Sequence, residues 1–85
     1  MTGTPRVLDC RGLFCPVPIV RTADEMKRMV EGEEVELLAD DPGVPGDLKA
    51  WCRGSGHELV SLEVSPDGSG VTTSLLRKRS RRGSR

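Results

Sequence analysis

A cysteine between a glycine and two prolines is the residue best suited to chemistry in this sequence. Cys15 lies in the segment Gly12–Pro18, which reads GLFCPVP. Proline is favoured at the first position of a helix, because its missing N–H would have no partner there. The segment therefore predicts a helix that begins at Pro16, with Cys15 as its N-cap. A thiol in that position lies at the positive end of the helix dipole, which stabilises the nucleophilic thiolate.

The helix dipole is expected to lower the pKa of Cys15 by about one unit from ~8.5. An N-cap side chain normally accepts from the amide of the second or third helical residue. Pro18 has no amide hydrogen, so only the amide of Val17 is left to donate to the sulfur. We therefore predict a moderately activated thiolate that can both attack and leave. The alternative is that Cys15 is a buried and inert cap residue.

The neighbours of Cys15 are expected to support it. Gly12 permits a tight turn, and the two prolines stiffen the backbone so that the thiol is held outward. Arg11 is the basic side chain in this segment that could lie beside a sulfur anion. The predicted site thus consists of the nucleophile Cys15 and a supporting set of Arg11, Gly12, Pro16, Val17 and Pro18.

The other two cysteines are expected to be structural residues. Cys10 is expected to be a small buried residue at a strand end, although a disulfide switch with Cys15 remains an alternative. Cys52 is expected to lie in the core. A zinc site built from these three thiols and His57 would lack the paired spacing typical of structural zinc, so we expect no metal or other cofactor. His57 is predicted to be a hydrogen-bonded structural imidazole, and the aspartates near the turns are predicted to be turn and cap residues: Asp9, Asp40 and Asp41.

Hydrophobic periodicity predicts the elements that position these side chains. Strands are expected over residues 6–9, 34–39, 58–64 and 71–76, the last two forming a hairpin around the turn at 66–70. One helix is expected to start at Pro16 and stop at Gly32. A second is expected to open at Asp40-Asp41-Pro42 and end at Gly54 and Gly56. The order βαβαββ predicts an α+β fold, a two-layer sandwich of a four-stranded mixed sheet with two helices on one face.

The same periodicity divides the side chains between core and surface. The expected core consists of Ile19, Val20, Ala23, Met26, Met29 and Val30 on the first helix, Val35, Leu37 and Ala39, then Val44, Leu48, Trp51 and Cys52, and finally Val60, Leu62 and Val64. The uncovered face of the sheet is expected to be more polar and to carry Glu34, Glu36, Ser61, Glu63, Thr72 and Ser74.

Length and charge limit the possible functions. The 85 residues form one domain at most, with no room for a Rossmann fold, a barrel or a large nucleotide pocket. Positive and negative charges balance at 13 each, yet six of the last nine residues are basic. We expect a domain over residues 1–76 and a basic, disordered tail over residues 77–85 that could contact tRNA phosphates weakly. Without an apolar stretch of ~20 residues or a signal peptide, the chain is expected to be a cytoplasmic monomer that does not enter a membrane.

Several short motifs occur here in a specific order. They are Leu-Asp at 8–9, Gly-Leu-x-Cys at 12–15, Cys-Pro-x-Pro at 15–18, Asp-Asp-Pro at 40–42, Trp-Cys at 51–52 and Gly-His-Glu-Leu at 56–59. From about Val7 to Arg77 the chain resembles the TusA/SirA-like sulfur-carrier proteins. It departs from some relatives in having Phe14 where a basic residue can precede the cysteine, Cys10 where Ala can occur, and a basic tail.

This resemblance implies a small sulfurtransferase that accepts sulfane sulfur as a persulfide on Cys15. It implies a donor that is a cysteine desulfurase or a rhodanese-type enzyme, and an acceptor protein in a sulfur relay that ends in tRNA thiolation, molybdenum-cofactor formation or dissimilatory sulfur metabolism. It also implies the βαβαββ sandwich, no cofactor and little turnover by the carrier alone. Two rival functions remain at this point: a nucleic-acid-binding or regulatory module acting through the tail, and a Cys10/Cys15 redox switch.

Overall fold

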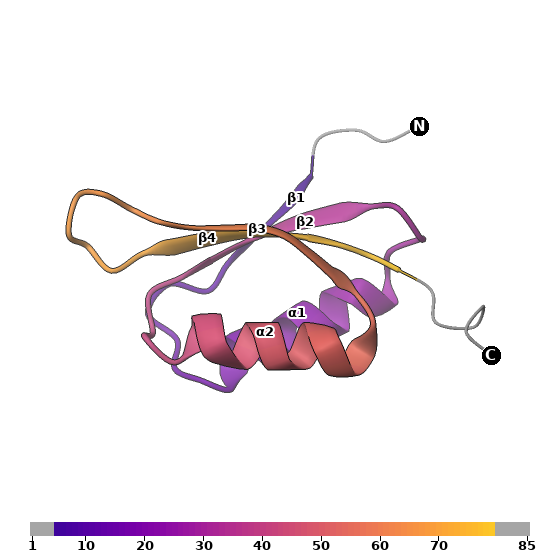
Figure 1. Cartoon of the computed structure of the whole chain (residues 1–85), viewed down its shortest axis with the longest axis horizontal. Coiled ribbons are helices and arrows are strands. Elements are labelled where there is room, and N and C mark those ends of the chain that lie inside the picture. The colour runs from indigo at the N-terminus through magenta and orange to yellow at the C-terminus, as the bar shows by residue number, and fades with distance from the viewer. Residues whose placement is uncertain (1–4, 80–85) are drawn as a thin grey trace.

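Alternating apolar side chains build the central sheet. The computed structural model describes residues 5–79 and contains, in chain order, β1 (Arg6–Asp9), α1 (Val17–Lys27), β2 (Glu34–Ala39), α2 (Val44–Ser55), β3 (Glu58–Val64) and β4 (Thr72–Arg77) (Figure 1). In β2, Val35, Leu37 and Ala39 are buried while the residues between them are half-buried. This period of two is that of a strand with one covered face. The predicted order βαβαββ is confirmed.

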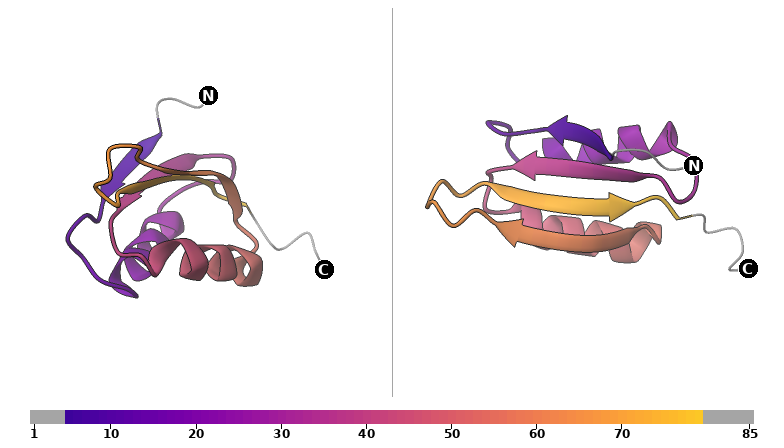
Figure 2. Two further views of the ribbon diagram at one scale, coloured as in Figure 1. Left: turned by 60° about the vertical axis from the view of Figure 1, so that its left-hand side comes forward. Right: turned by 90° about the horizontal axis from the view of Figure 1, so that it is seen from above.

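The sheet is mixed, and both helices lie on one side of it. Its strand order is β1-β2-β4-β3, with β1 parallel to β2 and the two other pairs antiparallel (Figure 2). The helices pack side by side beneath the sheet, and no helix among residues 5–79 covers its opposite face (Figures 1 and 2). The predicted two-layer sandwich is therefore correct.

The core lies between the sheet and the helices. Its buried members are Cys10, Met26, Met29, Val35, Leu37, Ala39, Val44, Leu48, Cys52 and Leu76. Of the residues predicted to be buried, Ile19 and Trp51 are half-buried and pack against this cluster. With aliphatic side chains and sulfur atoms filling the interior, the packing between the layers fixes the loops at their edges.

The buried face of the first helix overlaps the predicted one only in part: Met26 and Met29 are buried as predicted, and Ile19 packs against the core. Its buried residues are Pro18, Thr22 and Met26, whereas Val20 and Val30 are 53% and 67% exposed. Thr22 is tolerated inside because its hydroxyl donates to the carbonyl of Pro18 at 2.8 Å. The helix ends at Lys27, so Gly32 does not terminate it. Hydrophobic periodicity does not predict this face because two valines are exposed, whereas a threonine is buried with its hydroxyl hydrogen-bonded.

The second helix starts two residues later than Pro42, the predicted first position. Gly43 is its N-cap, and Gly56 ends it in the left-handed conformation, at φ 88°. Val44, Leu48 and Cys52 form its buried face as predicted. The short connection 40–43 thus belongs to a loop rather than to the helix.

Two residues predicted for the open sheet face lie inside. Thr72 and Ser74 are 6% and 0% exposed, because Leu76 of the same strand packs in the core and alternation brings both to its side. The open face does carry the predicted acidic residues, and Glu34 there accepts from Arg77 at 2.8 Å. In β3 a bulge between Leu59 and Ser61 shifts the register, and the predicted inward residues Val60 and Val64 are exposed.

The folded domain continues past the predicted boundary at residue 76. Arg77 is the last residue of β4, and Lys78 exchanges backbone hydrogen bonds with Gly32 and Glu33 at 2.9 and 2.8 Å. The amide of Arg79 donates to Nδ1 of His57 at 3.1 Å. The rest of the predicted tail, residues 80–85, lies outside the described residues. Over residues 5–79, no helix has the length and apolar character needed to span a bilayer.

Candidate functional site

The parallel pairing of β1 and β2 creates the site. Adjacent parallel strands end at the same edge of a sheet, so the loops that follow them meet there. The loop after β1 carries Cys15, and the loop after β2 carries Asp40 and Asp41. Asp40 Oδ1 accepts the amide hydrogen of Gly12 at 3.0 Å, and Asp41 Oδ2 accepts that of Cys15 at 2.6 Å. These two carboxylates hold the cysteine loop in place.

Cys15 lies over the first turn of α2. Its Sγ donates to Oδ2 of Asp47 at 2.9 Å. A Cβ atom added at Gly43 would be 3.8 Å from the same sulfur, so the two residues are neighbours across the loops. The Cys15 side chain is half-buried, whereas Cys10 and Cys52 are 0% and 7% exposed. Cys15 is therefore the thiol that a partner can reach.

The prediction that Cys15 is the N-cap of α1 is wrong by one residue. Pro16 is the N-cap, and the Cys15–Pro16 peptide bond is cis. The amide of Val17 donates to the carbonyl of Phe14 at 2.8 Å and is not available to the sulfur. The sulfur instead contacts the carboxylate of Asp47 on α2.

The predicted lowering of the Cys15 pKa is also wrong. The hydrogen bond to Asp47 is the largest cause, with burial and the charges of Asp47 and Asp41 adding to it, and together they raise the pKa of Cys15 from 9.0 to about 12. Two carboxylates near a thiol disfavour its anion, which outweighs a helix dipole worth about one unit. The resting thiol is protonated at neutral pH and donates its hydrogen to Asp47.

The other predicted support residues have mixed outcomes. Arg11 does not neutralise the site: its guanidinium bonds to both carboxylate oxygens of Asp9 at 2.9 and 2.7 Å. This contact lowers the pKa of Asp9 to about 2. Gly12 adopts φ 84°, which the turn before Cys15 requires. Pro18 is a buried residue of the first turn of α1 and anchors the start of that helix in the core.

The remaining cysteines and the histidine lie elsewhere. Cys10 is buried at the end of β1, and burial raises the pKa of its thiol, which makes it a poor partner for a redox switch. Cys52 packs in the core as predicted. His57 Nδ1 accepts from Arg79, and its ring lies 5.3 Å from that of Trp51, in agreement with a structural imidazole. Within residues 5–79 no group of three or more His, Cys, Asp or Glu side chains is placed to hold a metal ion.

Asp47 is the site residue that sequence reasoning missed. It lies 32 residues from Cys15, and its only local signature is that of an acidic residue in the first turn of a helix. The signal that could have found it is topological. Strands 6–9 and 34–39, joined by a helix, form a parallel pair, so the start of the second helix must lie near Cys15.

Exposed apolar side chains lie close to Cys15 in the sequence. Phe14 is 75% exposed, and Val17 and Val20 on the first turns of α1 are exposed as well. Large exposed apolar side chains on a small domain are typical of a surface that contacts another protein.

Comparison with known proteins agrees with this arrangement. The model of the family described as sulfurtransferase TusA matches residues 6–78, which is most of the chain. The chain belongs to the TusA family. The match includes the thiol loop, both helices and all four strands.

Relatives from bacteria support the assignment. YrkF of Bacillus subtilis, whose name describes a candidate sulfur carrier protein, is 42% identical over 72 residues, which are 85% of this chain and 37% of that protein. A similarly named protein of Aquifex aeolicus is 36% identical over 75 residues, 88% of this chain and 36% of its own length. The chain thus spans about a third of these two relatives. YrkI of B. subtilis is 44% identical over 63 residues, and the matched part is 74% of this chain and 81% of YrkI.

A solved structure shows the same fold. The crystal structure of the SirA-like protein from Desulfitobacterium hafniense superposes with a TM-score of 0.74 and covers 94% of this chain and 100% of its own. The two sequences are 20% identical. This likeness shows that the TusA-family chain has the same fold as the SirA-like protein.

Proposed function

We propose that the protein is a sulfur carrier that accepts sulfane sulfur as a persulfide on Cys15 and passes it to an acceptor protein. The observation that carries the proposal is the difference between its three thiols. Cys15 is half-buried at a loop edge, whereas both other thiols are buried. Membership of the TusA family and the names of its relatives support the same function.

Loading is an exchange between sulfur atoms without net oxidation. Cys15 Sγ attacks the outer sulfur of a persulfide on the donor. A new S–S bond forms at Cys15, the S–S bond of the donor breaks, and the donor cysteine leaves as a thiolate. The proton of Cys15 passes through Asp47 to that leaving thiolate, so that thiol and persulfide exchange places. Delivery runs in the same way, with an acceptor thiolate attacking the outer sulfur and Cys15 leaving.

Asp47 controls when this exchange begins. In the free protein the Asp47 carboxylate accepts a hydrogen bond from the Cys15 thiol and so keeps the proton on the sulfur, which makes the thiol unreactive towards chance oxidants. A donor that brings a cation against Asp47 would weaken this hold and favour the thiolate. The exposed apolar side chains of Phe14, Val17 and Val20 offer contact area for such a donor.

The partners follow from this chemistry. The donor must carry a persulfide, as a cysteine desulfurase or a rhodanese-type enzyme does, and the acceptor must offer a thiol in a relay such as tRNA thiolation. Such a relay takes place in the cytoplasm, where thiols stay reduced. The carrier needs both partners for turnover.

Intact-mass measurement tests the proposal. After incubation with a cysteine desulfurase and cysteine, the protein should gain the mass of one sulfur atom and lose it on reduction. Cys15→Ser should abolish the gain, because it removes the accepting thiol. Cys10→Ala and Cys52→Ala are the matched controls and should still load. A mass gain that survives in Cys15→Ser would reject Cys15 as the carrier residue.

A further inference from the structure

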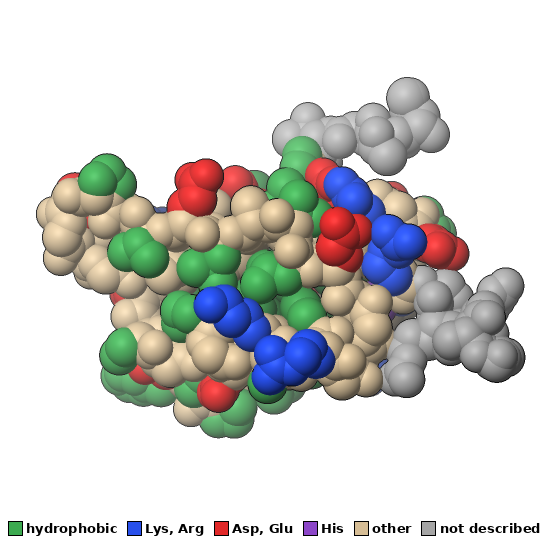
Figure 3. Space-filling view, in the orientation of Figure 1, with side chains coloured by type: hydrophobic (Ala, Val, Ile, Leu, Met, Phe, Trp, Pro, Cys, Tyr) green, Lys and Arg blue, Asp and Glu red, His purple; other side chains and the backbone are tan. Residues whose placement is uncertain are grey.

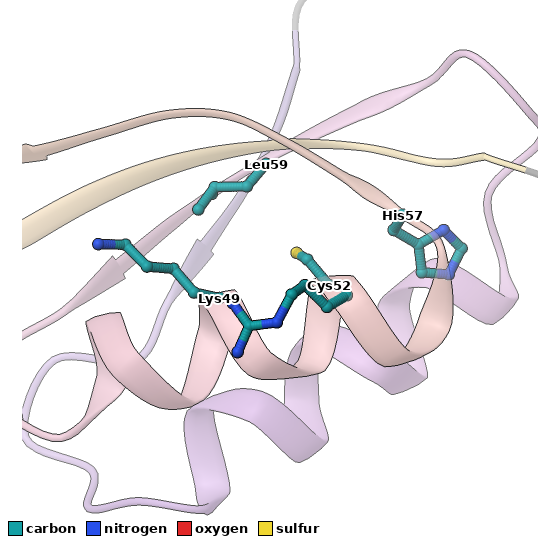
Figure 4. Close-up of a pocket in the computed structure, with 5 residues that line it drawn as sticks. Lys49, Cys52, His57 and Leu59 are labelled. Carbon is teal, nitrogen blue, oxygen red and sulfur yellow. The ribbon is translucent and has the colours of Figure 1, made fainter.

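A pocket on the far half of α2 is separate from the thiol loop. Its volume is about 330 Å³, and it is lined by Lys49, Cys52, Arg53, His57 and Leu59. It lies between α2 and the start of β3, and the Cys52 thiol and the Leu59 side chain point into the space between helix and sheet (Figure 4). Pockets for small ligands measure about 300–1,000 Å³, so this one suits a small molecule.

The floor of the pocket is apolar. Cys52 belongs to the core, and Leu59 packs against it from β3. The bulge after Leu59 turns the strand at this point and leaves Val60 partly exposed. On the face that Figure 3 shows, hydrophobic side chains remain visible between the sheet and the helix layer, beside basic side chains. An apolar group placed here would be removed from water.

The rim of the pocket is cationic and unpaired. Lys49 and Arg53 are exposed on α2, and within residues 5–79 neither forms an ion pair. The other described arginines of the sheet side, such as Arg6 and Arg77, are each paired with glutamates. Like charges at i and i+4 repel along a helix, and none of the five lining residues is acidic. An anion between the two cations would relieve this repulsion.

We propose that this pocket binds a small organic anion that has a short apolar body and one carboxylate or sulfonate group. The anionic group lies between Lys49 and the guanidinium of Arg53, which offers paired N–H donors to two oxygens. The apolar body rests on Cys52 and Leu59. His57, fixed by Trp51 and the amide of Arg79, closes the end of the pocket. This site does not depend on the sulfur-carrier function, and its ligand does not touch Cys15.

Titration with hexanoate, followed by the backbone amide signals of the full-length protein, tests the proposal. Saturable shifts are expected over residues 49–59. Hexanol at equal ionic strength should bind at least about tenfold more weakly, because it lacks the charge. Signals that drift without saturation, or hexanol binding as tightly as hexanoate, would overturn the proposal.

Charge-removal variants distinguish binding at this pocket from general electrostatic attraction to the protein. Lys49→Gln/Arg53→Gln should weaken hexanoate binding by about tenfold or more. Lys27→Gln/Arg28→Gln removes the same charge from the C-terminal end and C-cap of α1 and should leave the affinity unchanged. Equal weakening in both variants would mean that only net charge matters, against the proposed site. Cys15→Ser should bind hexanoate normally, so failure of the carrier function and failure of this proposal can be told apart.

Discussion

At the residue scale, the chemistry of Cys15 is set by a residue far away in the sequence. The local motif predicts a thiolate, yet the sulfur contacts Asp47 at 2.9 Å and its pKa rises to about 12. The motif does single out the one cysteine of the three that is not buried, because the flanking glycine and prolines keep its loop at the surface. Its electrostatics could not be predicted, since they depend on which carboxylate the fold brings next to it.

Replacing Asp47 by Asn should make Cys15 more reactive. The variant removes both the acceptor for the thiol hydrogen and a negative charge, so the pKa of Cys15 falls and the thiolate forms at lower pH. Near pH 8 the rate of alkylation by iodoacetamide should rise by about tenfold or more, because the gain in thiolate exceeds the loss of intrinsic nucleophilicity. A pH profile of the alkylation rate measures the shift directly.

Two further variants make this test specific. Asp47→Glu keeps the charge and should retain slow alkylation. Asp24→Asn removes an exposed carboxylate of α1 and should leave the profile unchanged. If Asp47→Asn alkylates no faster than the original protein, the contact with Asp47 does not control the thiol.

At the element scale, β4 is the strand whose inner face carries polar residues. The hydroxyl of Thr72 donates to the carbonyl of Ala39 at 3.3 Å. The Ser74 hydroxyl is buried, and it is the side-chain polar atom without a hydrogen-bond partner among the buried, described residues. Both residues were predicted for the open face, because their side chains are polar and β4 lacks a clean alternation. They are buried because the register that places Leu76 in the core puts them on the same face of β4.

These two positions should respond to substitution in opposite directions. Ser74→Ala should raise the free energy of unfolding by about 1 kcal/mol, since it removes an unpaired buried hydroxyl. Thr72→Val should lower it by about 0.5–1 kcal/mol, because it leaves the Ala39 carbonyl without this donor. Urea denaturation followed by circular dichroism measures both. A destabilised Ser74→Ala would show that its hydroxyl has a partner in solution.

The rest of the secondary structure follows from the sequence with few errors. Three strands occupy their predicted residues, because alternation and turn residues at 40–43 and 65–71 define their ends. The helix ends are predicted less accurately: α1 stops at Lys27, before Gly32, where the sequence predicts its end. Local signals locate an element well where its apolar face is regular, and poorly where valine is exposed or threonine is buried.

At the scale of the whole molecule, the last described residues tie the two layers together. Lys78 Nζ donates to the carbonyl of Met26 at 2.5 Å, while its backbone pairs with the turn before β2. Arg77 joins Glu34 and Glu58 across three strands. Their basic composition predicts a disordered tail. The composition does not show that Arg77 has glutamate partners on β2 and β3.

Truncation should therefore distinguish residues 77–79 from those that follow. A chain ending at Leu76 should lose about 2 kcal/mol or more of unfolding free energy, since it loses several hydrogen bonds worth about 0.5–1.5 kcal/mol each. A chain ending at Arg79 should keep the original stability in urea denaturation. It is also the proper variant for testing RNA binding by residues 80–85, because it removes Arg81, Arg82 and Arg85 without damaging the sheet. Equal stability of the two truncated chains would contradict the role given to Lys78 and Arg79.

The bulge in β3 has a consequence for how this molecule meets others. A regular border strand invites a foreign strand to align along it and extend the sheet. Here the extra residue between Leu59 and Ser61 interrupts the regular hydrogen bonding of one edge strand, β3. The opposite edge strand, β1, has four residues. Neither edge strand is therefore a good template for a strand from another protein, so partners must be recognised through side-chain contacts.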